Sequence, residues 1–209
     1  MSPCTRRIYM HSNARKMVSV AMFAAMGLVL QYVAFPVMPA FGFLKIDFSD
    51  IPVILSMFLF GPVSGILTAF LRSFLHLITT GLAPQNIVGD VASFLATTVY
   101  CLPIYYFFSK GAHLKNKIVG TLLGIFSLTL FMSVANYFVI TPLYLRFFQL
   151  SVDEMLGMPL ANYVVLGILP FNIVKGGLVS AVFLVLHAKL LPWISRKQHH
   201  SITHSSTLK

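Results

Sequence analysis

Long apolar runs, each close to the length of a bilayer-spanning helix, constrain the fold of this chain more than any other feature. A helix needs about 20 mostly apolar residues to cross the hydrocarbon core of a bilayer. Of the 209 residues, 57% are apolar and only 10% are Asp, Glu, Lys or Arg, and the mean hydropathy is +0.85. Ordinary soluble domains carry roughly 25% charged residues. The sequence therefore excludes a soluble or disordered chain and predicts an all-α integral membrane protein.

The apolar runs and the residues that interrupt them predict six transmembrane helices. Gly61-Pro62 divides one long run into two helices, because proline removes a backbone donor. The first of these is too short to span a bilayer unless it begins earlier or the bilayer thins. Pro142 and Pro170 are expected to kink or bound the last two helices. The predicted helices cover residues 17–35, 51–60, 63–79, 87–108, 118–145 and 163–193.

The distribution of charge predicts that both termini are cytoplasmic, because short cytoplasmic loops are enriched in Lys and Arg. With six crossings, the inner segments hold most of the basic residues, whereas all five acids lie in outer segments or at outer helix ends. The inner basic residues are Arg6, Arg7, Arg15, Lys16, Lys110, Lys115, Lys117, Lys189, Arg196, Lys197 and Lys209, and the acids are Asp47, Asp50, Asp90, Asp153 and Glu154. Arg72 and Lys175 fall within helices.

These boundaries divide the chain into a basic cytoplasmic N-terminus (1–16), a six-helix transmembrane domain (17–194) and a polar, solvated cytoplasmic tail (195–209). The dispersed basic residues follow topology and do not indicate nucleic-acid binding. Cys4 and Cys101 form no metal-ligand pattern. The sequence lacks a phosphate-binding loop and the motifs G-x-S-x-G and H-E-x-x-H, so it indicates neither an ATPase nor an enzyme.

Three polar side chains in apolar helices are candidate ligand-binding groups, because burying such groups in a membrane is costly. Asn172 and Lys175 share a helix face, and Asn136 lies toward the outer end of the preceding helix. A carboxamide supplies two donors and an acceptor, which suits a ring edge that alternates C=O and N–H. Alternatively, the two asparagines hydrogen-bond between helices while Lys175 pairs with Asp90 or extends to the membrane surface.

The segment before the second helix combines aromatic, charged and turn-forming residues. Asp50 before Ile51-Pro52 is expected to cap the helix N-terminus, and residues 44–47 could form a loop across the mouth of a pocket. His76 is interpreted as a histidine at a helix interface.

Four motifs in the same order resemble the riboflavin-binding S component of energy-coupling-factor (ECF) vitamin transporters. The resemblance covers about residues 16–193. The motifs are Phe43-Leu44-Lys45-Ile46-Asp47-Phe48-Ser49-Asp50-Ile51-Pro52, Phe60-Gly61-Pro62-Val63-Ser64-Gly65, Asn136-Tyr137-Phe138-Val139 and Pro170-Phe171-Asn172-Ile173-Val174-Lys175-Gly176.

The resemblance implies the ECF S-component fold, in the plasma membrane of a prokaryote. Such a subunit captures riboflavin outside the cell as its transported ligand and needs no cofactor. Its partners would be a transmembrane coupling subunit and two ATPase subunits. Matching positions imply that Leu44, Lys45, Ile46 and Asp47 belong to the closing loop, and that Asn136, Asn172 and Lys175 hold the flavin ring.

Ala21-x-x-x-Ala25 is similar to the small-residue motif by which S components dock on the coupling subunit, although packing within the bundle explains it equally well. Lys45 departs from the small polar residue expected between Leu44 and Ile46, so FMN is an alternative ligand if this side chain faces the site. The sequence also leaves open an S component for a different vitamin and a stand-alone ion-coupled carrier.

Overall fold

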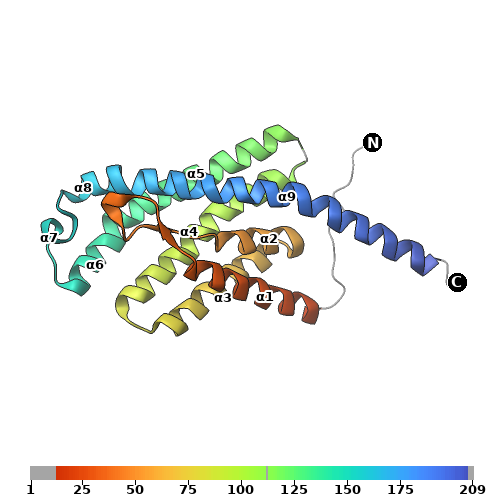
Figure 1. Cartoon of the computed structure of the whole chain (residues 1–209), viewed down its shortest axis with the longest axis horizontal. Helices are drawn as coiled ribbons and strands as arrows, with labels where there is room; N and C mark the ends of the chain where they lie inside the picture. The colour runs from red at the N-terminus through yellow and green to blue at the C-terminus, as the bar shows by residue number, and fades with distance from the viewer. Residues whose placement is uncertain (1–12, 112, 207–209) are drawn as a thin grey trace.

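The computed structural model describes residues 13–111 and 113–206, most of them in helices that run along one long axis (Figure 1). The helices are α1 (Asn13–Tyr32), α2 (Asp50–Phe60), α3 (Pro62–Thr80), α4 (Pro84–Ser109), α5 (Leu114–Ala135), α6 (Thr141–Phe148), α7 (Val152–Leu156), α8 (Leu160–Tyr163) and α9 (Leu169–Ser206). A 3₁₀-helical segment, η1 (Pro39–Phe41), two π-helical segments, η2 (Asn136–Ile140) and η3 (Val164–Ile168), and two strands, β1 (Phe35–Pro36) and β2 (Lys45–Ile46), complete the described structure.

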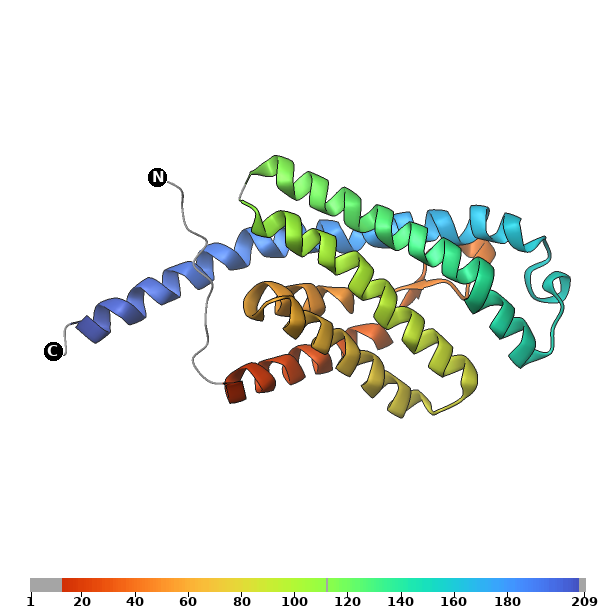
Figure 2. The same ribbon diagram turned by 180° about the vertical axis from the view of Figure 1, so that it is seen from behind.

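The connections between helices gather at two opposite ends of the bundle. One end carries the β1–β2 hairpin, the connection from α3 to α4, and α7 (Figures 1 and 2). The opposite end carries the start of α1, the α2–α3 turn, the α4–α5 connection and the extended end of α9. This up-and-down arrangement brings the two ends of the described chain to the same side.

Six helical segments occupy the six predicted ranges, with α5–η2–α6 and α8–η3–α9 each forming one long element. Within the described residues, four segments are long and apolar enough to cross a membrane: 62–80, 84–109, 114–148 and 152–189. The apolar parts of α1 and α2 are shorter. The structure therefore supports a helical membrane protein, and the number of crossings stays a prediction.

The shortest of the six, α2, is also at the centre of the bundle. Its side chains Val53 and Met57 are fully buried, and they belong to one apolar core together with Tyr100 of α4 and Phe183 of α9. A helix surrounded by others on several sides is apolar around most of its circumference, which explains why this sequence lacks a polar face.

Two glycines allow the sharp turn and the close helix contact that this packing needs. Gly61, with φ of +97°, joins α2 to α3 and precedes Pro62 at the first position of α3. A left-handed φ is available to glycine at little cost. In α5, a Cβ on Gly124 would lie 2.9 Å from the carbonyl oxygen of Tyr100, so glycine lets α5 approach α4 closely.

Two π-helical segments precede Pro142 and Pro170, and neither proline ends its helix. The Thr141 N–H donates to the Asn136 carbonyl, and the Leu169 N–H donates to the Val164 carbonyl. These bonds span five residues, so the helix widens just before each proline, whose own nitrogen donates nothing. Such π segments occur frequently at functional sites, and the predicted ligand residue Asn136 begins the first of them.

Helix α9 continues through residue 195 to Ser206, so the predicted polar tail begins inside a helix. Residues 1–12, which make up most of the predicted basic N-terminus, and residues 207–209 lie outside the described structure.

Candidate functional site

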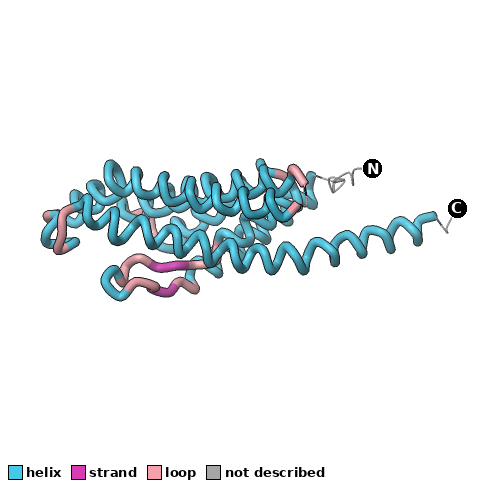
Figure 3. The backbone as a smooth tube through the Cα atoms, turned by 90° about the horizontal axis from the view of Figure 1, so that it is seen from above, coloured by secondary structure: helices cyan, strands magenta, loops and turns pink. Residues whose placement is uncertain are grey.

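A short hairpin between α1 and α2 forms the predicted loop. Strands β1 and β2 pair antiparallel, with Phe35 opposite Ile46 and Pro36 opposite Lys45. Figure 3 shows the two strands in magenta on one side of the bundle, at the end away from the termini. Side chains alternate along a strand, and accordingly Ile46 is fully buried while Lys45 is exposed.

The tip of the hairpin packs on an apolar cluster formed with α5, α8 and η3. Phe41 is buried against Tyr163, with ring centroids 5.5 Å apart, and Leu44 contacts the same apolar cluster. That cluster also includes Met132 of α5 and Ile168 of η3. Each of these residues precedes one of the predicted amides, Asn136 or Asn172, by one helical turn. The hairpin therefore covers the region in which the predicted polar groups lie.

Lys175 joins α9 to the hairpin through an ion pair. Its Nζ lies 3.2 Å from Oδ2 of Asp47 and 3.9 Å from Oδ2 of Asp50. The alternative pairing with Asp90 is wrong, because Oδ1 of Asp90 lies 2.7 Å from Nδ1 of His76 on the neighbouring helix. His76 thus lies at a helix interface, as expected.

The Asp47 carboxylate is held in its charged form. Burial acts to raise the pKa of Asp47, but the Lys175 ammonium, hydrogen bonds from Ser49 and the Arg72 guanidinium outweigh burial and lower the pKa below its usual value. Oδ1 of Asp47 accepts from both the backbone N–H, at 2.9 Å, and the hydroxyl of Ser49. Because the folded-state pKa is lowered, the charged Asp47 carboxylate stabilises the folded protein. This stabilisation is lost as the pH falls through the folded-state pKa.

Asn136 and Asn172 are both buried, and their side chains bond mainly to their own helices. The Asn172 amide donates to the Ile168 carbonyl at 2.8 Å, and the Asn136 amide donates to the Met132 carbonyl at 2.8 Å. Oδ1 of Asn136 also accepts from Thr141. Within the described structure, neither amide makes the interhelical hydrogen bond that was the alternative to ligand binding.

Arg72 is the polar residue of this region that the sequence did not identify as functional. It is fully buried, and its Nη1 donates to Ser49 Oγ at 2.8 Å and to Asp50 Oδ1 at 3.0 Å. Its Nη2 donates to Ser93 Oγ at 3.0 Å and to Thr97 Oγ1 at 2.8 Å. The sequence nevertheless contained a signal for Arg72, because a charged residue in an apolar helix is itself unusual.

The predicted role of Asp50 as a helix cap is wrong. Ser49 occupies the cap position without a side-chain capping bond, and Asp50 is the first residue of α2. The Asp50 carboxylate instead accepts from Arg72 and, at 2.6 Å, from the Thr97 hydroxyl. Because this carboxylate pairs with the buried guanidinium, it is not used to cap the start of α2.

The two alanines of the small-residue motif, Ala21 and Ala25, are exposed on α1. The face of α1 that packs on the bundle carries Val20, Ala24 and Gly27. A Cβ on Gly27 would lie 3.1 Å from Cδ of Arg72, so this face approaches the buried guanidinium closely. Packing within the bundle therefore does not account for Ala21 and Ala25.

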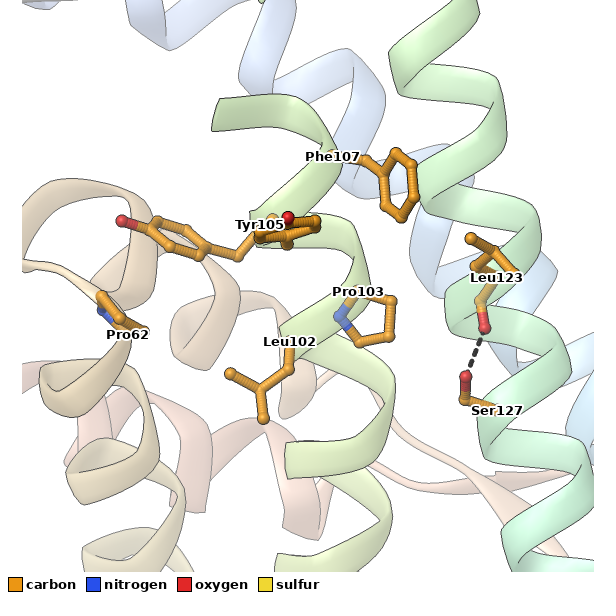
Figure 4. Close-up of a pocket in the computed structure, with 8 residues that line it drawn as sticks. Pro62, Leu102, Pro103, Tyr105, Phe107, Leu123 and Ser127 are labelled. Atoms are coloured by element: carbon orange, nitrogen blue, oxygen red, sulfur yellow. Dashed lines mark hydrogen bonds between the residues drawn. The ribbon is translucent and has the colours of Figure 1, made fainter. Parts of the chain in front are cut away.

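A separate pocket of about 560 Å³ lies near the opposite end of the bundle, between the start of α3, α4 and α5 (Figure 4). Its lining is mostly apolar or aromatic, and the Ser127 hydroxyl donates to the Leu123 carbonyl. None of the predicted ligand residues lines it. The lining residues are Pro62, Leu102, Pro103, Tyr105, Tyr106, Phe107, Leu123 and Ser127.

Comparison with known proteins identifies relatives over most of this chain. The family described as "ECF transporter, substrate-specific component" matches residues 15–187. The chain is 37% identical over 186 residues to the riboflavin transporter FmnP of Bacillus subtilis, covering 89% of this chain and 97% of that protein. It is 34% identical over 184 residues to the riboflavin transporter RibU of Streptococcus thermophilus, covering 88% and 86% of the two chains.

A solved structure is similar in both fold and sequence. It is the structure reported as "Structure and mechanism of the S component of a bacterial ECF transporter". The TM-score is 0.72 at 31% identity, and the match covers 88% of this chain and 99% of the other. The arrangement of helices in Figure 1 is therefore one that a solved S component also adopts.

Proposed function

The chain belongs to the family of ECF transporter substrate-specific components, and from this membership we propose that it captures riboflavin at the outer face of a prokaryotic plasma membrane. The family is a transporter component and not an enzyme. Relatives at 37% and 34% identity are named riboflavin transporters, which favours riboflavin over other vitamins. The single structural observation that carries the proposal is the ion pair between Asp47 of the hairpin and Lys175 of α9.

In the proposed site, the hairpin residues 44–47 close over the ligand, and Asn136, Asn172 and Lys175 bind the polar edge of the flavin ring. Leu44 supplies an apolar contact and Ile46 fixes the strand by its burial. The amides exchange their bonds within the helix for bonds to the ring. Since those bonds already satisfy part of each amide, the site loses little stability when it is empty.

The charges around the site favour an uncharged ligand. Asp47 and Asp50 balance Lys175 and Arg72, and the four groups are joined by contacts of 3.0–3.9 Å. Riboflavin carries no phosphate, whereas the phosphate of FMN would add negative charge to these four groups, whose charges already sum to zero. An uncompensated charge in a buried site is costly.

Lys45 is expected to contribute only its backbone, because its side chain is exposed on β2. Exchanging Lys45 for Thr should leave the ratio of riboflavin affinity to FMN affinity unchanged. Competition titrations with the two flavins measure this ratio. A shift of tenfold or more would mean that the Lys45 side chain reaches the ligand.

The charge at the two ends of the bundle supports the proposed orientation. The end with the α4–α5 connection carries Lys110, Lys115 and Lys117, and the hairpin end carries Asp47 and Asp50. Basic loops favour the cytoplasm. We therefore place the hairpin and its site outside and both termini inside, with six crossings.

Ala21 and Ala25 form the proposed contact with the coupling subunit, since small residues allow close helix approach in lipid. Replacing both with Leu should leave riboflavin affinity unchanged but abolish uptake by the assembled transporter. Uptake is measured in proteoliposomes that contain the coupling subunit and the two ATPase subunits. The matched control replaces Met17 and Val18, which are exposed on the same helix, with Leu. Normal uptake by the variant that carries both Ala21→Leu and Ala25→Leu would reject the docking role.

Uptake assays in proteoliposomes with and without the partner subunits separate the proposed function from an ion-coupled carrier. We expect no accumulation of riboflavin by the chain alone, with or without a proton or sodium gradient. Accumulation should require both the partner subunits and ATP. Uptake by the chain alone that depends on an ion gradient would favour the carrier instead.

A further inference from the structure

A continuous line of hydrogen bonds runs from buried Arg72 to the proposed ligand site. Nη1 of Arg72 donates to Ser49 Oγ at 2.8 Å, and the Ser49 hydroxyl donates in turn to Asp47 Oδ1. Oδ2 of the same carboxylate accepts from Lys175 at 3.2 Å. A serine hydroxyl has one proton to donate and lone pairs to accept with, so Ser49 can serve both neighbours at once.

The other side of Arg72 repeats this pattern and fixes the guanidinium in place. Nη2 donates to Thr97 Oγ1, and the Thr97 hydroxyl donates to Asp50 Oδ1. Nη2 also donates to Ser93. Arg72 of α3 is thus held by α4 and by the start of α2. Its planar, permanently charged fork can hold several acceptors in a fixed geometry, unlike the flexible ammonium of lysine.

Ser49 is the point at which this buried network meets the hairpin. It is 2% exposed and directly follows the segment that carries Ile46 and Asp47. Its backbone N–H and its hydroxyl both bond to Asp47 Oδ1. The position of the Asp47 carboxylate, and therefore of its partner Lys175, depends on where Arg72 holds the Ser49 hydroxyl.

We propose that Arg72 is a positioning residue, which acts through the Ser49 hydroxyl to hold the hairpin closed and to aim the Asp47–Lys175 pair at the ligand. The effect on ligand affinity rests on the proposed function, whereas the effect on the hairpin does not. Arg72 itself does not contact the ligand. Its role is to slow opening of the hairpin and thereby to slow ligand release.

Ser49→Ala tests this proposal without leaving Arg72 unpaired, since the bonds to Asp50, Ser93 and Thr97 remain. The matched control is Ser56→Ala, which removes an equally buried hydroxyl that bonds to Thr68 at 2.7 Å between α2 and α3. Ser49→Ala removes two hydrogen bonds of a buried hydroxyl and Ser56→Ala removes one. Both variants should therefore lower the unfolding temperature, Ser49→Ala by at least as much as Ser56→Ala. Only Ser49→Ala should affect the hairpin.

The first readout is hydrogen exchange of the backbone amides of residues 42–48 in the ligand-free protein. Ser49→Ala should speed this exchange roughly fivefold, the factor that corresponds to one net hydrogen bond, and Ser56→Ala should not. Unchanged exchange in Ser49→Ala would overturn the proposal, whatever the ligand of the protein is.

The second readout is the rate constant for riboflavin dissociation. Ser49→Ala should raise it roughly fivefold and should have no further effect when combined with Asp47→Ala, because both changes break the same line of bonds. Full additivity of the two changes would overturn the positioning role. If the wild-type protein binds no riboflavin, the proposed function fails, and the exchange experiment alone decides whether Arg72 holds the hairpin.

Discussion

Replacing Arg72 with Leu should destabilise the protein by about 3–5 kcal/mol, the typical cost of removing one partner from a buried ion pair. The guanidinium is fully buried and bonds to Ser49, Asp50, Ser93 and Thr97. Without it, the Asp50 carboxylate keeps only the Thr97 hydroxyl and the more distant Lys175. Unfolding in detergent, followed by the thermal midpoint and by titration with a denaturing detergent, measures the loss.

The matched control for this variant is Arg146→Leu, because Arg146 is exposed on α6. It removes the same side chain and should change stability by less than about 0.5 kcal/mol. Adding Asp50→Asn to Arg72→Leu should restore part of the lost stability, since no buried carboxylate then remains unpaired. If Arg72→Leu unfolded at the same midpoint as the control, the network around Arg72 would not stabilise the fold.

Replacing Lys175 with Ala should weaken riboflavin binding by about 1–3 kcal/mol, which is roughly fivefold to more than a hundredfold in the dissociation constant. The variant removes the group that joins α9 to the hairpin, and it leaves Asp47 without its nearest cation. Asn136→Ala should produce an effect in the same range. Equilibrium titrations with riboflavin measure both.

Lys115→Ala serves as the control for Lys175, because Lys115 is exposed at the opposite end of the bundle. It removes one positive charge and should leave affinity unchanged. Unchanged riboflavin affinity in both Lys175→Ala and Asn136→Ala would contradict the proposed site. A loss of affinity in Asn136→Ala alone would indicate a site near η2 that does not include the Asp47–Lys175 pair.

The helices could be predicted from the sequence because membrane insertion imposes a simple requirement on length and hydropathy. The predicted helix 63–79 agrees with α3 at 62–80, since Gly61-Pro62 marks its start. Within the described residues, each of the six predicted ranges is occupied by helix, although the number of crossings stays a prediction. The two-residue strands could not be predicted, because hydrogen bonds between segments about ten residues apart leave no periodic pattern in so short a stretch.

The partners of the buried charges could not be read from the sequence either. Arg72 and Asp50 are 22 residues apart on different helices, and only the fold brings them together. The same holds for Lys175 and Asp47, which are 128 residues apart. The sequence marks which residues need a partner, because an ionisable group in an apolar helix is costly, but not which partner each finds. Ser49 gave no such signal, because a serine beside an aspartate is common.

The most direct test of the central claim is to titrate the purified chain in detergent with riboflavin, following the quenching of flavin fluorescence, with FMN and thiamine as comparators. We expect saturable binding of one riboflavin per chain without ATP or any partner, with weaker binding of FMN and none of thiamine. A folded sample that binds no flavin, or that prefers thiamine, would contradict the assignment of riboflavin as the ligand.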